Sequence, residues 1–474
     1  MMANRALQHE CGLMGALAHD GRDIVEAVYL GLYALQHRGQ EGAGIVSRSR
    51  TKTRVHRGLG LVGDIFTPKS MAYLAGHMAI GHNRYATHGR STKLRNVQPL
   101  LVDYKGGKLA IAHNGTVVNA RQLRRQMEGL GSIFQTTTDS ELVLHLAARS
   151  RAPDVVARLC EALAEIEGAY TMLAMNEECL IGYRDPGGWR PLVVGRNGAV
   201  WLVASETCAL DILGAELVRE VGAGEMVILR PGREPEWHQV FPPAEPLSQC
   251  IFEHIYFSRP DSRVFGESVD RIRRRLGAAL ARRHPAAADI VIAVPDSSNG
   301  AALGYAMESG TPFEFGLIRN HYVGRTFIQP KQTGRTHAVR VKFNAVCDVL
   351  AGRRVVVVDD SIVRGTTSRR LVQFLRTAGA REVHFRVSSP PVRHPCFYGI
   401  DTPTWDELIA NGRTVEAIRS FIGATSLGYL SAEDLLDSVT HPEDYCLACF
   451  TGHYPTEIPV PERAGATTPR TRAE

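Results

Sequence analysis

Apolar and polar residues follow one rhythm over the first 230 residues of the chain. Short apolar runs typical of strands occur there, among them GLMGALA (12–18) and KLAIAHN (108–114). A buried helix face within 23–37 is predicted by the spacing of Ile24, Val28, Leu32 and Leu35. A second helix is predicted within 139–150, where Asp139 can cap the first turn. This part of the chain therefore mixes many strands with few helices.

The rhythm changes after residues 230–249, a proline-dense stretch predicted to be a linker or a long crossing segment. Beyond it, DIVIAVPDSS (289–298) is an apolar strand followed by a polar turn and the start of a helix. The stretch from 353 to 379 repeats this order around four consecutive valines. Strands alternating with helices predict βαβ units on a parallel sheet.

Composition narrows the classes of protein that fit. The 474 residues are 44% hydrophobic and 22% charged, an ordinary globular balance with room for two large domains or three. A net charge of +6, with scattered arginine pairs and no interleaved aromatics, suits small phosphorylated ligands better than nucleic acid. No apolar run reaches the ~18 residues that span a membrane. The polar leader lacks a secretory signal, so nine cysteines predict a reduced, cytoplasmic compartment and metal binding or catalysis.

The most informative segment is VVVVDDSIVRGTT (355–367). Its valines predict a strand buried on both faces, which ends at Asp359 and Asp360. Backbone N–H groups of residues 361–367, with their hydroxyls, can then surround a phosphate at a helix N-terminus. The two carboxylates can hold ribose hydroxyls or a hydrated Mg²⁺. The alternative is a solvated strand end with capping residues.

This segment resembles the phosphoribosyl-pyrophosphate (PRPP) motif of type I phosphoribosyltransferases. The resemblance implies that Asp359 and Asp360 lie on the ribose and metal side. The PRPP-binding loop is then formed by Ser361, Arg364, Gly365, Thr366 and Thr367. Ser297, in VPDSS at the end of another strand, can supply an oxygen to the same Mg²⁺, although a plain turn serine fits that position too.

Cys11 allows two interpretations on local grounds. A free cysteine packs as a small hydrophobic residue at the start of a strand. Alternatively, cleavage after Glu10 exposes a cysteine that carries both a thiol and an α-amine, a nucleophile with its own base. The surrounding motifs resemble the N-terminal-nucleophile (Ntn) glutaminase domain of class II amidotransferases; in chain order they are CGLMG, LQHRGQEGAGI, GHNRYATHG, HNGTVVN and TTTDSE.

A glutaminase domain followed by a PRPP loop resembles one family over nearly the whole chain, glutamine phosphoribosylpyrophosphate amidotransferase. The resemblance implies an α+β Ntn domain (an αββα sandwich) over 11–235 and an α/β type I phosphoribosyltransferase domain over 236–455. Residues 1–10 are then a propeptide and 456–474 a disordered tail. The implied reaction transfers ammonia from glutamine to C1 of PRPP, the committed step of purine synthesis.

The resemblance also implies roles for single residues of the glutaminase domain. Cys11 is the nucleophile, and its α-amine is the base, since an α-amino group in an unstructured peptide has a pKa of about 7.7–8.0. Asn114 and the N–H of Gly115 form the oxyanion hole. Arg84 binds the α-carboxylate of glutamine and Asp139 its α-amine.

Other implied features lie in the second half of the chain. A flexible loop over 322–342 covers PRPP and lines an ammonia path, with Tyr322, Arg325 and Phe327 as lining residues. A 4Fe–4S cluster is bound by Cys250, Cys396, Cys446 and Cys449. On local evidence only CLAC (446–449) has ligand spacing, and it fits zinc as well as iron. The family further implies a homotetramer inhibited by purine nucleotides.

Three positions depart from the pattern of the family: His88, Thr116 and Gly188–Trp189. None of them is assigned to chemistry, although His88 and Thr116 border the expected glutamine pocket. Competing functions each leave a segment unexplained. A nucleobase phosphoribosyltransferase has no use for CGLMG, and a sugar-phosphate amidotransferase or asparagine synthetase lacks the loop at 355–367. A PRPP-sensing protein would not need Cys11, Arg84 and Asp139 together.

Overall fold

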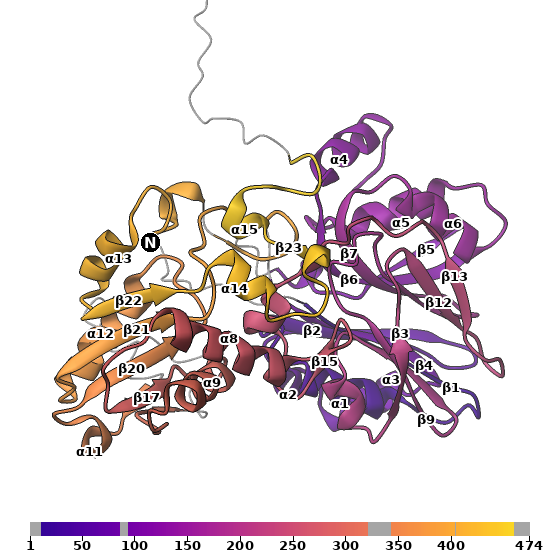
Figure 1. Ribbon diagram of the computed structural model, residues 1–474. Coiled ribbons are helices and arrows are strands. Elements are labelled where there is room, and N and C mark those ends of the chain that lie inside the picture. The colour runs from indigo at the N-terminus through magenta and orange to yellow at the C-terminus, as the bar shows by residue number, and fades with distance from the viewer. Residues whose placement is uncertain (1–10, 86–92, 321–342, 403, 459–474) are drawn as a thin grey trace, which may run out of the picture.

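A computed structural model describes residues 11–85, 93–320, 343–402 and 404–458 of the chain. The first half, in indigo and magenta, forms one body, and the second half, in orange and yellow, forms another beside it (Figure 1). The described residues include no helix long and apolar enough to span a membrane.

Two antiparallel sheets stack in the first half. The seven-stranded sheet has the order β11 (Glu216–Glu220), β9 (Val193–Asn197), β10 (Val200–Ala204), β1 (Gly12–Ala18), β4 (Met78–Arg84), β2 (Gly42–Arg48) and β3 (Thr53–Leu59). The six-stranded sheet has the order β13 (Glu236–Gln239), β12 (Glu225–Leu229), β8 (Leu180–Tyr183), β7 (Gly168–Met175), β6 (Gly107–Val117) and β5 (Leu100–Tyr104). Their facing side chains, including Leu13, Leu17, Ala110 and Leu173, form a buried core between the sheets.

Helices cover the outer face of each sheet. The seven-stranded sheet packs against α1 (Val25–Ala34), α2 (Val62–Ile65), α3 (Pro68–Leu74) and α7 (Cys208–Asp211). The six-stranded sheet packs against α4 (Ala120–Gly129), α5 (Ser140–Arg149) and α6 (Val155–Leu163). A short helical turn, η1 (Leu94–Asn96), precedes β5. The result is the expected four-layer αββα sandwich.

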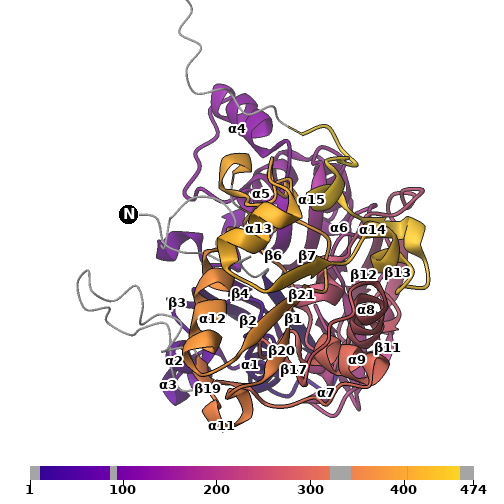
Figure 2. The same ribbon diagram turned by 60° about the vertical axis from the view of Figure 1, so that its left-hand side comes forward.

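A parallel sheet forms the centre of the second half, in the order β17 (Ile290–Ala293), β20 (Arg354–Asp359), β21 (Glu382–Val387) and β22 (Ser426–Tyr429). The four valines of β20 alternate between its faces. Val356 and Val358 join the core under α8 (Val269–Arg283) and α9 (Asn299–Ser309). Val355 and Val357 join the core under α12 (Thr366–Thr377) and α13 (Val415–Ile422). Figure 2 shows these two helix pairs on either side of the sheet.

Shorter elements complete the second half. They are β14 (Gln249–Cys250), η2 (Glu253–Phe257), β15 (Arg263–Val264), β16 (Glu267–Ser268), β18 (Leu317–Arg319), β19 (Phe343–Ala345), α11 (Cys347–Leu350), η3 (Trp405–Glu407), α14 (Ala432–Leu436), η4 (Pro442–Asp444), β23 (Tyr445–Cys446) and α15 (Ala448–Thr451). The pairs β15–β16 and β18–β19 are antiparallel, whereas β14 and β23 are parallel.

The strands predicted at 12–18 and 108–114 are confirmed, as are the two early helices and the Asp139 cap. The segment 230–249 is more ordered than predicted, because its middle forms β13 and pairs with β12 at the edge of the six-stranded sheet. Proline at 231 and 235 lies outside the paired residues, so it costs the sheet no hydrogen bond.

The two halves contact each other closely near residue 398. Trp189 stacks on Tyr398 with ring centroids 3.8 Å apart, and Nη2 of Arg190 donates to the carbonyl oxygen of Tyr398 at 2.8 Å. A Cβ atom added at Gly399, where φ is +117°, would lie 3.2 Å from Cα of Gly115. The backbones of β6 and of the segment after Cys396 therefore lie close together, and the positive φ of Gly399 disfavours a side chain there.

Candidate active site

Cys11 lies buried at the start of β1, a central strand of the seven-stranded sheet. Its thiol donates a hydrogen bond to the carbonyl oxygen of Tyr85 over 3.6 Å. Gly12 pairs with Asn83 on β4, so Cys11 and Arg84 are the next residues along two paired strands. Arg84 is buried as well. The fold thus brings together the residues expected to attack glutamine and to bind its carboxylate.

Asn114 and Gly115 lie on β6 of the opposing sheet. The ring of His82 on β4 donates through Nε2 to the carbonyl oxygen of His113 at 3.1 Å, which joins the sheets at this end. Burial lowers the pKa of His82 to about 3, so this ring is neutral. The amide nitrogen Nδ2 of Asn114 is buried and has no hydrogen-bond acceptor among the described residues. Such a donor is available to an oxyanion.

Gly115 has a φ of +140°, and a Cβ atom there would lie 2.0 Å from the carbonyl oxygen of Ala169. Only glycine fits that position without moving β7. Asp139 stands beside it as the N-cap of α5, with one carboxylate oxygen accepting from the N–H of Ser140 and the other from the N–H of Val117, both at 2.9 Å. The Asp139 side chain is a quarter exposed, and its Oδ1 lies 3.7 Å from Nδ1 of His113.

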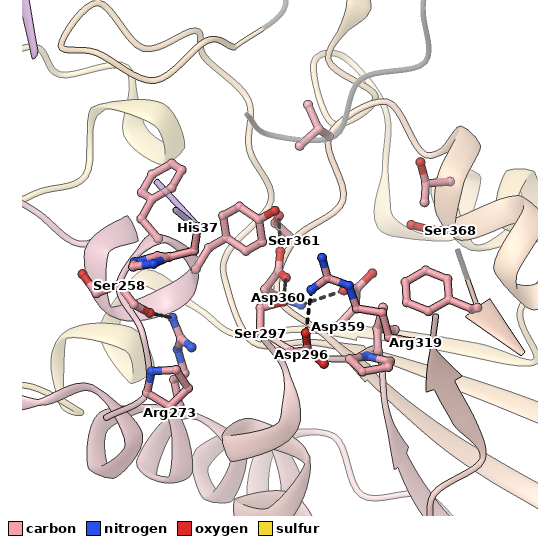
Figure 3. Close-up of a pocket in the computed structure, with 18 of the residues that line it drawn as sticks. His37, Ser258, Arg273, Asp296, Ser297, Arg319, Asp359, Asp360, Ser361 and Ser368 are labelled. Atoms are coloured by element: carbon pink, nitrogen blue, oxygen red, sulfur yellow. Dashed lines mark hydrogen bonds and ion pairs between the residues drawn. The ribbon is translucent and has the colours of Figure 1, made fainter. Parts of the chain in front are cut away.

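A cavity of about 310 Å³ opens at the carboxyl ends of β17 and β20 (Figure 3). Every residue expected to bind PRPP or Mg²⁺ lines it: Ser297, Asp359, Asp360, Ser361, Arg364, Gly365, Thr366 and Thr367. Parallel α/β sheets bind ligands at this edge, and the N-terminus of α12 points its N–H groups there.

Hydrogen bonds fix the acidic pair in this cavity. Oγ of Ser297 donates to one carboxylate oxygen of Asp360 at 2.6 Å, and Oγ of Ser361 donates to the other at 2.7 Å. The N–H of Asp360 donates to Oδ1 of Asp359 at 3.0 Å. Carboxylate and hydroxyl oxygens are hard ligands that suit Mg²⁺. The guanidinium of Arg364, by contrast, pairs with Glu407 at 3.1 Å.

Sequence reasoning missed several residues of this cavity. His37 and Gln40 come from the first half of the chain, whereas Arg273 belongs to α8. Asp296 and Arg319 also line the cavity and form an ion pair at 2.5 Å. Figure 3 shows His37 and Arg273 on one side of the cavity and this pair on the other. His37 falls within the motif LQHRGQEGAGI, which was the signal available for it.

The four cysteines expected to bind a cluster converge at the boundary between the halves. Cys250 and Cys446 are register partners on the parallel strands β14 and β23. The N–H of Tyr398 donates to Sγ of Cys396 at 3.3 Å. Burial, and then the thiols of Cys446, Cys396 and Cys250, raise the pKa of Cys449 well above its usual value.

The spacing of these thiols bears on which metal group they fit. No three of the four sulfur atoms lie within 4.8 Å of one another. Among the described residues, the one group of three His, Cys, Asp or Glu ligand atoms within that distance is His441, Glu443 and Asp444. Four ligands on a single zinc ion would bring the sulfur atoms to roughly 3.8 Å from each other, given tetrahedral Zn–S bonds of ~2.3 Å. The four sulfur atoms are therefore spaced more widely in this structure than four ligands of one zinc ion.

Several expected features lie outside the described residues. These are the propeptide at 1–10, His88 at the edge of the glutamine pocket, most of the tail from 456 onward, and the loop residues Tyr322, Arg325 and Phe327. Thr116 and Trp189 are described. Thr116 is buried on β6 and Trp189 stacks between the halves, so neither enters the cavity above.

Comparison with known proteins shows which proteins the chain is similar to. A family model described as a glutamine amidotransferase domain matches residues 82–211. An amidophosphoribosyltransferase of Bacillus subtilis is 50% identical over 460 residues, which cover 96% of each chain.

Two solved structures cover 94% of the chain at 49% identity. One, described as the allosteric regulatory enzyme of purine biosynthesis, superposes with a TM-score of 0.90 over 97% of its own length. The other is glutamine PRPP amidotransferase from Bacillus subtilis complexed with ADP and GMP, with a TM-score of 0.88 over 98% of its length. The chain belongs to the amidophosphoribosyltransferase family, the enzymes that transfer ammonia from glutamine to C1 of PRPP in purine biosynthesis.

Proposed function

We propose that the first half-reaction occurs at Cys11 after residues 1–10 have been removed. The observation that carries this proposal is the position of Cys11, buried at the start of β1 beside Arg84 and opposite the strand of Asn114. A thiol at the first residue of the mature chain has its own α-amine as base. Because the pKa of an α-amine in an unstructured peptide is about 7.7–8.0, that amine accepts a proton near neutral pH.

The remaining glutaminase roles are proposed from the resemblance to the family, and the same geometry supports them. The unpartnered Nδ2–H of Asn114 and the N–H of Gly115 stabilise the oxyanion that forms when sulfur attacks the amide carbon. Arg84 binds the α-carboxylate of glutamine, and Asp139 binds its α-amine. Because Asp139 also caps α5, its carboxylate is already oriented before substrate arrives.

Removal of residues 1–10 is the first expected result. Active enzyme should have the mass of a chain that begins at Cys11, because a peptide bond at that nitrogen removes the base. Intact-mass spectrometry of purified, active protein measures this directly. Blocking the cleavage with Glu10→Pro should leave an unprocessed chain without glutamine-dependent activity. Full activity in an unprocessed chain would contradict the proposal.

The second half-reaction is proposed to occur in the cavity at the end of β20. Asp359 and Asp360 bind the ribose hydroxyls. Together with Ser297, they also supply oxygen ligands to Mg²⁺. When bound, Mg²⁺ neutralises charge that develops on the departing pyrophosphate. The backbone N–H groups of residues 361–367 and the hydroxyls of Thr366 and Thr367 bind the 5-phosphate. Arg364 belongs to this loop, but its pairing with Glu407 makes the backbone the main phosphate ligand.

Ammonia must pass between the sites without entering bulk water, where it would be protonated. His37 and Gln40 reach the PRPP cavity from the glutaminase half, which supports a short internal route. Tyr322, Arg325 and Phe327 are proposed to line that route. The glutaminase and phosphoribosyltransferase domains are proposed to span 11–235 and 236–455, with a tail from 456 to 474.

We further propose that Cys250, Cys396, Cys446 and Cys449 bind one 4Fe–4S cluster. The support is their convergence from separate segments and a sulfur spacing wider than one zinc ion requires. No step of the reaction moves an electron, so the cluster is structural. It would tie β14, β23 and the segment after residue 394 together.

Protein purified without oxygen is therefore expected to be brown and to contain about four iron atoms per chain, the stoichiometry of a four-thiolate cluster. Cys446→Ser should lose the iron and lower the melting temperature, because metal binding is coupled to folding. Cys347→Ser, which changes an exposed cysteine outside the set, is the matched control and should retain both. A colourless, fully stable protein, or one zinc ion per chain, would contradict the cluster.

A cytoplasmic location is proposed, since thiolate catalysis and cluster ligation both need reduced cysteines. A homotetramer is proposed from the resemblance to the family. Inhibition by purine nucleotides is proposed as well. Its support is the relative solved with ADP and GMP and the relative described as an allosteric regulatory enzyme.

A further inference from the structure

A cluster of buried charges joins the two halves next to Cys11. Arg38 and Glu206 come from the first half and Glu253 from the second, and each side chain is fully buried. Nη1 of Arg38 donates to Glu206 at 2.6 Å, and Nη2 donates to Glu253 at 2.7 Å. Arg190 lies 3.7 Å from the same carboxylate of Glu253. Two carboxylates from different halves thus form ion pairs with one guanidinium.

The third side of that guanidinium faces the nucleophile. Nε of Arg38 donates to the carbonyl oxygen of Cys11 at 3.1 Å. A guanidinium is planar and rigid, so fixing its Nη atoms also fixes the direction of its Nε–H. The orientation of the Cys11 peptide therefore depends on Glu253, which lies more than 200 residues away in the sequence.

The turn at 35–41, which carries Arg38, also contacts the PRPP cavity and Arg84. His37 lines the cavity, and its Nε2 shares Oε1 of Glu206 with Arg38, at 2.7 Å. A Cβ atom at Gly39 would lie 2.7 Å from the carbonyl carbon of Arg84, so the turn rests directly on that residue. The N–H of Glu41 donates to the carbonyl oxygen of Arg84 at 3.1 Å.

On the other side, Glu253 begins the segment 253–258, which forms part of the cavity wall. Oγ of Ser258 donates to Glu253 at 2.5 Å, and Ser258 itself lines the cavity with Tyr256 and Phe257. Arg273 fixes the backbone of this segment by donating to the carbonyl oxygens of His254 at 2.7 Å and Ser258 at 2.8 Å. Figure 3 shows Ser258, Arg273 and His37 together on this wall.

Charges in this position are not required for packing alone. Replacing a buried ion pair by apolar residues of similar volume is often neutral or stabilising, so stability gives little reason for the pair. Both carboxylates accept hydrogen bonds from Arg38. Although burial opposes ionisation of Glu206, His37 and Arg38 hold its pKa well below the usual value. The charges instead fix the orientation of the Arg38 guanidinium, and with it the hydrogen bond to the carbonyl oxygen of Cys11.

We propose that Arg38 is a positioning residue for the Cys11 nucleophile, and that Glu253 of the second half holds Arg38 in place. Glutamine hydrolysis then depends on how segment 253–258 packs around the PRPP cavity, which links the rate at one site to the state of the other. The inference rests on the proposed role of Cys11 as nucleophile.

Glu253→Gln tests the link, because it keeps the size of the side chain and removes its charge. We expect the ratio of glutamine-dependent to ammonia-dependent synthesis to fall about ten-fold or more, the effect of one weakened charge-assisted hydrogen bond. The fall should appear in kcat with glutamine, and the ammonia-dependent rate of the same variant corrects for any effect on the PRPP cavity. Glu267→Gln is the matched control, since Glu267 also joins two segments, through Thr440, but lies outside the cluster. An unchanged ratio in Glu253→Gln would overturn the proposal.

A labelling experiment separates failure of this inference from failure of the proposed function. A glutamine-like diazoketone reports a correctly placed nucleophile, whereas iodoacetamide reports a merely accessible thiol. Arg38→Lys keeps the positive charge but loses the planar guanidinium with its fixed N–H donors. In this variant, labelling of Cys11 by the diazoketone should slow about ten-fold more than labelling by iodoacetamide. Equal slowing would overturn the positioning role. Absence of diazoketone labelling at Cys11 in the unmodified enzyme would instead overturn the proposed nucleophile. This variant also decides the matter if Glu253→Gln loses ammonia-dependent activity through misfolding.

Discussion

Replacing Cys11 by alanine is expected to abolish synthesis from glutamine while synthesis from added ammonia continues. The thiol forms the covalent intermediate, and its loss should lower the glutamine-dependent rate by a factor on the order of 10⁶, as when a covalent nucleophile is removed from a hydrolase. Cys11 does not line the PRPP cavity, so ammonia supplied from solution still reaches an intact site. Pyrophosphate release with each nitrogen source measures both rates.

The control for this variant is Cys179→Ala. Cys179 is a buried thiol in the same half, bonded to Asn176 and remote from the site, so both activities should survive its replacement. Glutamine-dependent turnover that persists in Cys11→Ala would leave Cys11 as a core residue of β1. Loss of both activities would point to a folding defect, which the melting temperature would reveal.

Asp359→Ala and Asp360→Ala should greatly reduce synthesis with either nitrogen source. Each carboxylate is proposed to serve the ribose and Mg²⁺, and two lost charge-assisted contacts correspond to a reduction of roughly 100-fold or more. Basal glutamine hydrolysis at Cys11 should remain, because neither residue belongs to the first half. The larger loss of synthesis is expected for Asp360→Ala, since serine hydroxyls in the cavity hold both carboxylate oxygens of Asp360 in place.

Asp289→Asn is the matched control for the acidic pair. Asp289 precedes β17 and pairs with Arg354 at 2.7 Å at the opposite end of the same sheet. Its change should leave both activities close to those of the parent enzyme. Normal synthesis from ammonia in the Asp359 and Asp360 variants would mean that the pair only terminates a strand.

Features set by neighbouring residues could be predicted from the sequence. The valines of β20, the acidic pair after them and the turn into α12 follow one another within 25 residues, and local periodicity determines each. The Asp139 cap is local as well. For the glutaminase residues, resemblance to a known family supplied what periodicity alone could not, because Cys11 alone is equally a core cysteine.

Features set by contacts between distant segments could not be predicted. The edge strand β13 gains its hydrogen bonds from β12, so a proline-rich, aperiodic sequence still forms a strand. His37 lies on a turn that packs against the second half, and its motif LQHRGQEGAGI indicates the glutaminase domain but not a place in the PRPP cavity. The contact between Arg38 and Glu253 depends on how the two halves dock, which neither segment encodes alone.

The close approach of Gly115 and Gly399 has a consequence for exchanging parts between relatives. The two backbones leave 3.2 Å for an added Cβ, and one of them belongs to the oxyanion strand while the other follows Cys396. A chimera that joins one glutaminase half to another transferase half therefore needs glycine at position 399 of the transferase half, where φ is +117°. The glycine at 115 is required within the glutaminase half itself, because a Cβ atom there would lie 2.0 Å from the carbonyl oxygen of Ala169.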